Sequence, residues 1–127
     1  SQRLDVYRRL QLLDTLDDYN AINREMIDRY GRFPESIEKL LFLVEIKTIC
    51  RILHIKRVYI ANGDVRFDVE RTTPISLIEI SGSLEAGFIF VSEFCLGLNL
   101  KRKNWKEDMI SIANHLKVIL RLVNAAQ

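Results

Sequence analysis

Residues 25–34 read Glu-Met-Ile-Asp-Arg-Tyr-Gly-Arg-Phe-Pro, and they predict a helix end, a turn and the start of a second helix. Gly31 is typical of the position after a helix, where the backbone takes a positive φ that glycine adopts at little cost. Pro34 is typical of a helix start, because the N–H that it lacks would have no intrahelical acceptor there. We therefore expect one helix to end at Tyr30 and another to begin at Pro34.

The helix before this turn is amphipathic. At about 100° per residue, the stretch 16–30 gathers its apolar side chains on one arc. They are Leu16, Tyr19, Ile22, Met26, Ile27 and Tyr30. Glu25 and Asp28 fall on the opposite side, together with Asp17 and Ala21, so packing gives these two acids no role.

Two interpretations of this acidic face remain open on the residues alone. It can be a solvated helix face, in which Glu25 pairs with Arg29 and Arg24 pairs with Asp28, each pair contributing a few tenths of a kcal/mol. It can also be a docking surface for a basic partner, with the small Ala21 allowing close approach.

Helices dominate the first fifty residues. Leu4, Tyr7 and Leu10 predict a first helix of about three turns, and Thr15 with Asp18 predicts the N-cap of the second. The third is expected from Pro34 to about Leu53, on apolar positions that repeat at helical spacing.

The period then changes to two. Val58 and Ile60, the Asn62-Gly63 dipeptide and the alternation from Val65 to Val69 predict a hairpin with a type I′ turn. A second hairpin is expected from residues 88–91 to 96–100.

Two further helices are expected around the second hairpin. The Thr73-Pro74 pair starts a short one that Gly82 ends, and Asn104 with Glu107 starts a long C-terminal one. The chain is therefore predicted to be a single α+β domain over 1–127: three N-terminal helices, a small antiparallel sheet of two hairpins with a short intervening helix, and a long C-terminal helix.

Composition places few demands on the chain. Its 127 residues carry a net charge of +2 and contain no run of eighteen apolar residues, so we expect a cytoplasmic protein that does not enter membranes. Two cysteines fit a reducing compartment. We expect Cys50 to be a buried hydrophobe in a helix and Cys95 to lie in a short connection, neither acting as a nucleophile.

The sequence contains no motif for nucleotide or metal chemistry. A phosphate-binding loop and a dinucleotide fingerprint are both missing, and the two histidines, His54 and His115, have no ligand cluster at metal-binding spacing. We therefore expect no catalytic residue, no cofactor site and no metal site.

A local basic cluster precedes the last helix. Lys101, Arg102, Lys103 and Lys106 could contact phosphates, which supports an alternative function as a small nucleic-acid-binding module. Lysines at a strand edge can equally discourage strand pairing. Four cations set against seventeen acids make nucleic-acid binding by the isolated domain the weaker expectation.

The order of residues resembles a known family. Glu25, Asp28, Arg29-Tyr30-Gly31 and Pro34, followed by Leu40-Leu41 and Ile46-Lys47, is similar to the C-terminal domain of the bacterial transcription-repair coupling factor. Upstream, the resemblance includes Leu4, Tyr7, Arg8 and Arg9. Downstream, the resemblance reaches Leu53-His54-Ile55 and fades after about residue 70. His54 stands where the family usually has Gly. We read His54 as a tolerated left-handed helix cap.

The resemblance implies a non-catalytic regulatory domain of a longer protein that contains an ATP-dependent DNA translocase. Such a domain docks on the UvrB-like module of the same parent chain and masks its UvrA-binding surface until the parent engages stalled RNA polymerase. The acids that the family uses at this interface fall on Glu25 and Asp28, with Asp17, Ala21 and Arg29 as weaker candidates. The chain also begins within a helix at Ser1, as expected for a domain excised from a longer one. RNA polymerase and DNA are then expected to bind other domains of the parent.

Overall fold

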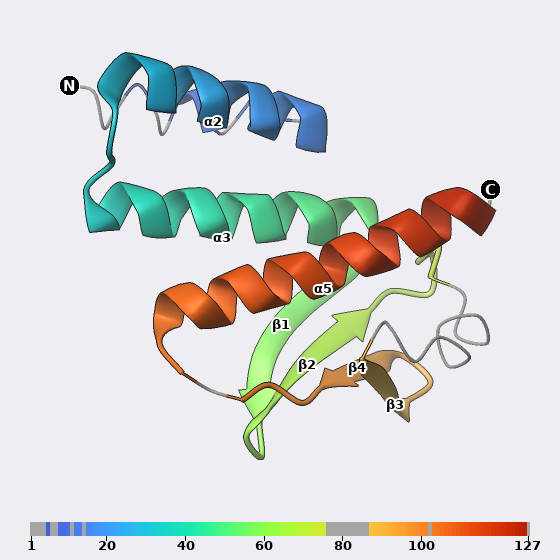
Figure 1. Ribbon diagram of the computed structural model, residues 1–127. Helices are drawn as coiled ribbons and strands as arrows, with labels where there is room; N and C mark the ends of the chain where they lie inside the picture. The colour runs from blue at the N-terminus through green and yellow to red at the C-terminus, as the bar shows by residue number, and fades with distance from the viewer. Residues whose placement is uncertain are drawn as a thin grey trace. The chain divides into compact units, whose positions relative to one another are not determined.

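The computed structural model describes residues 5, 8–10, 12–13, 15–75, 87–101 and 103–126. The chain divides into two compact units, Ser1–Thr48 and Ile49–Gln127, with the boundary inside helix α3. Each unit is described separately below. Helices, one antiparallel sheet and a long C-terminal helix make this an α+β fold, which confirms the predicted class (Figure 1).

The first unit is built on α2 (Leu16–Tyr30) and the first part of α3 (Glu35–Ile52). The predicted caps are confirmed: the Thr15 hydroxyl accepts a hydrogen bond from the Asp18 N–H, and Gly31 has a φ of 69°. Pro34 directly precedes α3, and its carbonyl accepts from the N–H groups of Ile37 and Glu38. These contacts fix where each helix begins and ends.

The core of this unit joins α2 and α3 through apolar side chains. Its buried members are Leu10, Leu13, Tyr19, Met26, Ile37 and Leu41. Of the described residues before Thr15, Asp5 and 8–10 are helical, as the predicted first helix requires.

The prediction of the apolar arc was wrong for one residue, Ile27. Ile27 is 49% exposed, although it was expected to face the core. It lies about 100° round the helix from the buried Met26, so it falls at the margin of the stripe that α3 covers.

The second unit contains a four-stranded antiparallel sheet in the order β1-β2-β4-β3. The strands are β1 (Ile55–Ala61), β2 (Asp64–Val69), β3 (Phe88–Ser92) and β4 (Cys95–Leu98). Both predicted hairpins are present. Asn62 and Gly63 have φ values of 54° and 80°, as a type I′ turn requires, and His54 takes the expected left-handed conformation with a φ of 55°.

Helix α5 (Trp105–Ala126) covers one face of this sheet (Figure 1). The Phe88 ring meets Phe67 edge to face at 5.5 Å and the His115 ring of α5 at 6.0 Å, so both phenylalanines lie on the covered face. Phe67, Leu96, Leu116 and Ile119 are fully buried there. These side chains form the core between the sheet and α5.

Two further predictions concern the strands and the segment between the hairpins. Cys95 begins β4 and is buried, so its placement in a connection was wrong. Val58 and Ile60 pair with the buried Phe67 and Val65, yet both are exposed on β1, which lies at the edge of the sheet. Most of the predicted short helix after Thr73-Pro74 lies outside the described residues.

Candidate functional site

The outward face of α2 carries the residues that the sequence marked for docking. Asp17, Ala21, Glu25, Asp28 and Arg29 are all exposed. Tyr19 and Met26 hold the opposite side of the helix in the core, and the cap at Thr15 and the turn at Gly31 fix its ends. The face is therefore presented on a rigid element.

Glu25 has a specific partner within the chain. The Arg9 guanidinium donates a hydrogen bond to the Glu25 carboxylate and forms an ion pair with it, between side chains that are 38% and 45% exposed. This hydrogen bond is the main reason that the pKa of Glu25 lies below its ordinary value, and that the pKa of Arg9 is raised. The two positions are sixteen apart in the sequence, so the pair left no local signal there.

The i,i+4 pairs expected for a solvated face do not form among the described residues. Glu25 bonds to Arg9 rather than to Arg29, whose guanidinium lies over the Tyr30 ring at 5.4 Å. Within the described part of the chain, Asp28 has neither a hydrogen-bond nor an ion-pair partner. The two acids that the sequence treats alike are thus in different electrostatic states.

The second charged region surrounds the start of α5. The Asn104 side chain caps the helix by accepting from the Glu107 N–H at 2.9 Å, as predicted. Asp108 is buried, and its Oδ1 accepts from the Lys103 backbone N–H at 3.1 Å. The Lys103 ammonium lies 3.9 Å from the Glu107 carboxylate. Two carboxylates thus lie next to Lys103, one of the cations of the predicted basic cluster.

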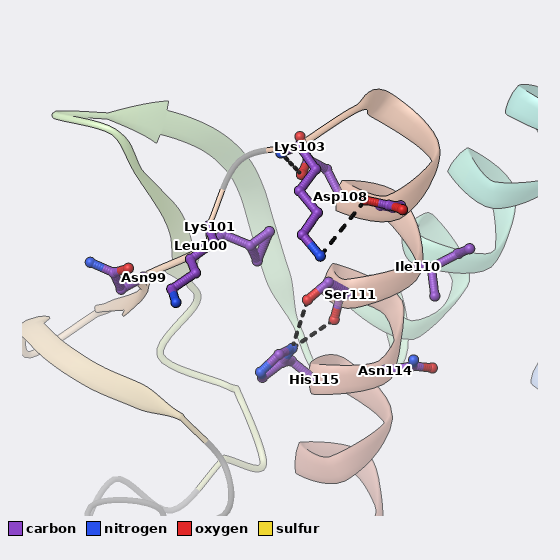
Figure 2. A pocket seen from close by; sticks show the side chains of 10 residues that line it. Asn99, Leu100, Lys101, Lys103, Asp108, Ile110, Ser111, Asn114 and His115 are labelled. Carbon is purple, nitrogen blue, oxygen red and sulfur yellow. Dashed lines mark hydrogen bonds and ion pairs between the residues drawn. The ribbon is translucent and has the colours of Figure 1, made fainter.

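A cavity of about 430 Å³ opens beside this helix start (Figure 2). Its wall on α5 includes His115, whose Nδ1–H donates to the Ser111 carbonyl at 2.7 Å. The lining residues are Asn99, Leu100, Lys101, Lys103, Glu107, Asp108, Ile110, Ser111, Asn114 and His115. Of the predicted basic cluster, Lys101 and Lys103 line this cavity and Lys106 lies in the exposed first turn of α5, while Arg102 is outside the described residues.

Neither cysteine thiol is activated as a nucleophile in this structure. Burial raises the pKa of Cys50 to about 11, and it also raises the pKa of the buried Cys95. Both thiols are therefore protonated near neutral pH, when a nucleophile would need to be a thiolate.

The described residues offer neither a membrane span nor a metal site. None of the described helices is long and apolar enough to cross a membrane. No three His, Cys, Asp or Glu side chains in the described part of the chain are grouped closely enough to hold a metal ion.

Comparison of folds places this chain in a class of α+β domains that has a solved example. It matches the "Crystal structure of C-terminal domain of transcription-repair coupling factor" with a TM-score of 0.73, over 99% of this chain and 83% of that one. The identity is 18%, so this match concerns the fold alone.

Sequence comparison then identifies the family. The TRCF domain model matches residues 1–80, and the chain therefore belongs to the TRCF domain family. This confirms the resemblance found in the sequence. The matched range includes all of α2 and ends before the basic cluster.

Two curated relatives agree with this assignment. The transcription-repair-coupling factor of Bacillus subtilis (strain 168) is 36% identical over 50 residues, which is 39% of this chain and 4% of that protein. The transcription-repair-coupling factor of Helicobacter pylori (strain J99) is 31% identical over 65 residues, which is 51% of this chain and 6% of that protein. The chain thus spans only a small part of the length of these relatives.

Proposed function

We propose that this chain is a non-catalytic regulatory domain of a transcription-repair coupling factor, and that it restrains its parent by docking through α2. The parent is then an ATP-dependent DNA translocase that engages stalled RNA polymerase during transcription-coupled repair. In this proposal, the domain binds the UvrB-like module of the same parent chain and masks its UvrA-binding surface. The mask opens when the parent engages the polymerase.

The observation that carries the proposal is the exposed acidic face of α2, which lies inside the family match. Glu25 and Asp28 are both exposed on a helix whose other side is in the core, so a partner can reach them without unfolding the helix. Carboxylates on a rigid helix suit arginine partners, because guanidinium groups donate charge-assisted bonds in a fixed geometry. A mask that must also come off favours a polar interface of moderate area.

The alternative, a nucleic-acid-binding module that uses Lys101, Arg102, Lys103 and Lys106, gains less support. Lys103 lies beside Glu107, and the buried Asp108 is bonded to the backbone of the same segment. These acids lower the positive potential that phosphate binding needs.

The test replaces both acids in the full-length parent. Glu25→Ala with Asp28→Ala should increase UvrA binding by roughly tenfold, because losing charge-assisted bonds shifts a closed-to-open balance by about 1–3 kcal/mol. Capture of UvrA by the immobilised parent measures this change.

Glu93→Ala is the matched control, since it removes one exposed carboxylate from the β3–β4 turn and not from α2. It should leave UvrA capture unchanged. Unchanged capture by the double variant, in a parent shown by its proteolysis pattern to be closed, would refute the masking role.

A further inference from the structure

We infer that the docking surface on α2 is centred on Asp28 and Ile27, while Glu25 is an internal anchor that Arg9 holds. This inference rests on the proposed function and deepens it. It separates two acids that the sequence presents as an equivalent pair.

The first step is the cost of using Glu25. Its carboxylate already accepts a charge-assisted hydrogen bond from Arg9, and both side chains are only partly exposed. An incoming arginine would exchange with Arg9 and gain little, since one guanidinium–carboxylate bond replaces another. Glu25 therefore contributes to docking only when Arg9 is displaced.

The second step is the availability of Asp28. In the described part of the chain its carboxylate has no partner, and Arg24, one turn earlier, forms no ion pair with it. A charged group that is exposed and unpaired can gain a full charge-assisted bond on binding, without breaking one first.

The third step is the apolar neighbour. Ile27 is next to Asp28 in the chain and is 49% exposed, although the rest of the apolar arc is buried or packed against the core. Asp17, Ala21, Arg24 and Asp28 follow one another along the same stripe of α2, which is roughly 16 Å long at 1.5 Å per residue. The surface thus ends in an acid beside an exposed isoleucine, with the small Ala21 at its middle.

This arrangement fits a partner surface with an arginine beside an apolar group. The guanidinium would bind Asp28, and the apolar group would cover Ile27, excluding water from the charge-assisted bond. A charged anchor from which neighbouring contacts exclude water is typical of an interaction hot spot.

The experiment measures binding of this chain to the purified UvrB-like module of the parent by isothermal titration calorimetry. Asp28→Asn should weaken the affinity by about ten- to a hundredfold, and Ile27→Ala by several-fold. Glu25→Gln, one turn away, is the comparison variant and should weaken it by less than twofold, and Glu93→Gln on the β3–β4 turn is the control that should leave it unchanged. Circular dichroism confirms that each exposed-site variant keeps the helix.

A second measurement tests the role of Arg9. In an Arg9→Ala background Glu25 is released, so Glu25→Gln should then weaken binding several-fold, which a purely structural role for the pair does not predict. Equal losses from Asp28→Asn and Glu25→Gln in the unmodified background, or a Glu25→Gln effect independent of Arg9, overturn this inference and leave the proposed function standing. If none of the variants alters binding, the proposed function itself fails.

Discussion

The acidic face of α2 and the segment at the start of α5 show two uses of similar charged residues. Each region brings acids and bases together within three helical turns. At α5, Asp108 is buried against the Lys103 backbone, and Glu107 lies beside the Lys103 ammonium. On α2, Asp28 is exposed and has no partner among the described residues. The Asp108 carboxylate is therefore bonded within its own segment, whereas the Asp28 carboxylate has no such partner in the described part of the chain.

This difference shows that a high density of charged residues does not by itself make a binding surface. The basic cluster is the more conspicuous feature of the sequence. The neighbouring acids Glu107 and Asp108, however, interact with Lys103 of that cluster. A region binds a partner through charges that its own fold leaves unsatisfied.

The largest expected effect compares one acid from each region. Asp108→Ala should lower the free energy of unfolding by about 1–3 kcal/mol, because the Lys103 N–H loses its acceptor in a part-buried site. Asp28→Ala should change it by less than about 0.5 kcal/mol, as expected for an exposed side chain without such a contact. Urea denaturation followed by circular dichroism measures both values. Equal losses from the two variants would remove the distinction drawn here.

A smaller effect concerns DNA binding by the basic segment. If four cations contacted phosphates, the logarithm of the affinity would fall against the logarithm of salt concentration with a slope near −3.6, at about −0.9 for each contact. We expect a slope magnitude no greater than about 2.7, because the acids beside Lys103 offset one of the four cations. Fluorescence anisotropy with labelled duplex DNA between 50 and 200 mM salt, roughly the range in which such slopes are seen, measures this slope. Tight binding that Lys101→Ala and Lys106→Ala abolish would make the nucleic-acid module the better function.

Local rules predicted much of this fold from the sequence. The Thr15 cap, the positive φ of Gly31 and His54, and the Asn62-Gly63 turn each depend on a few adjacent residues, and all are present. Hydrophobic period correctly separated the helices from the strands.

Contacts between distant residues were not predictable in the same way. The Arg9–Glu25 pair spans sixteen positions, and no residue near either member announces it. The exposure of Ile27 depends on how much of α2 its neighbours in the first unit cover. Cys95 was assigned to a connection because the turn between β3 and β4 has no strong sequence signal. The acidic face of α2 was found from periodicity and resemblance, but the unequal states of its two acids required the structure.

The smallest expected effect is the pH dependence of the Arg9–Glu25 pair. The pKa of Glu25 is lowered in the folded chain, chiefly by its hydrogen bond to Arg9, so the pair stabilises the fold above the ordinary pKa of 4.5 and loses this contribution as pH falls through the lowered value. Both side chains are partly exposed, so solvent screening keeps the contribution small. In Arg9→Ala, the pKa of Glu25 should rise toward its ordinary value, because its hydrogen bond to Arg9 is lost. The carboxyl carbon shift of Glu25, followed by NMR between about pH 2 and 7, measures this change, because that range spans the titration of ordinary carboxyl groups. An unchanged Glu25 titration in Arg9→Ala would show that the pair does not persist in solution, and the two acids of α2 would again be equivalent.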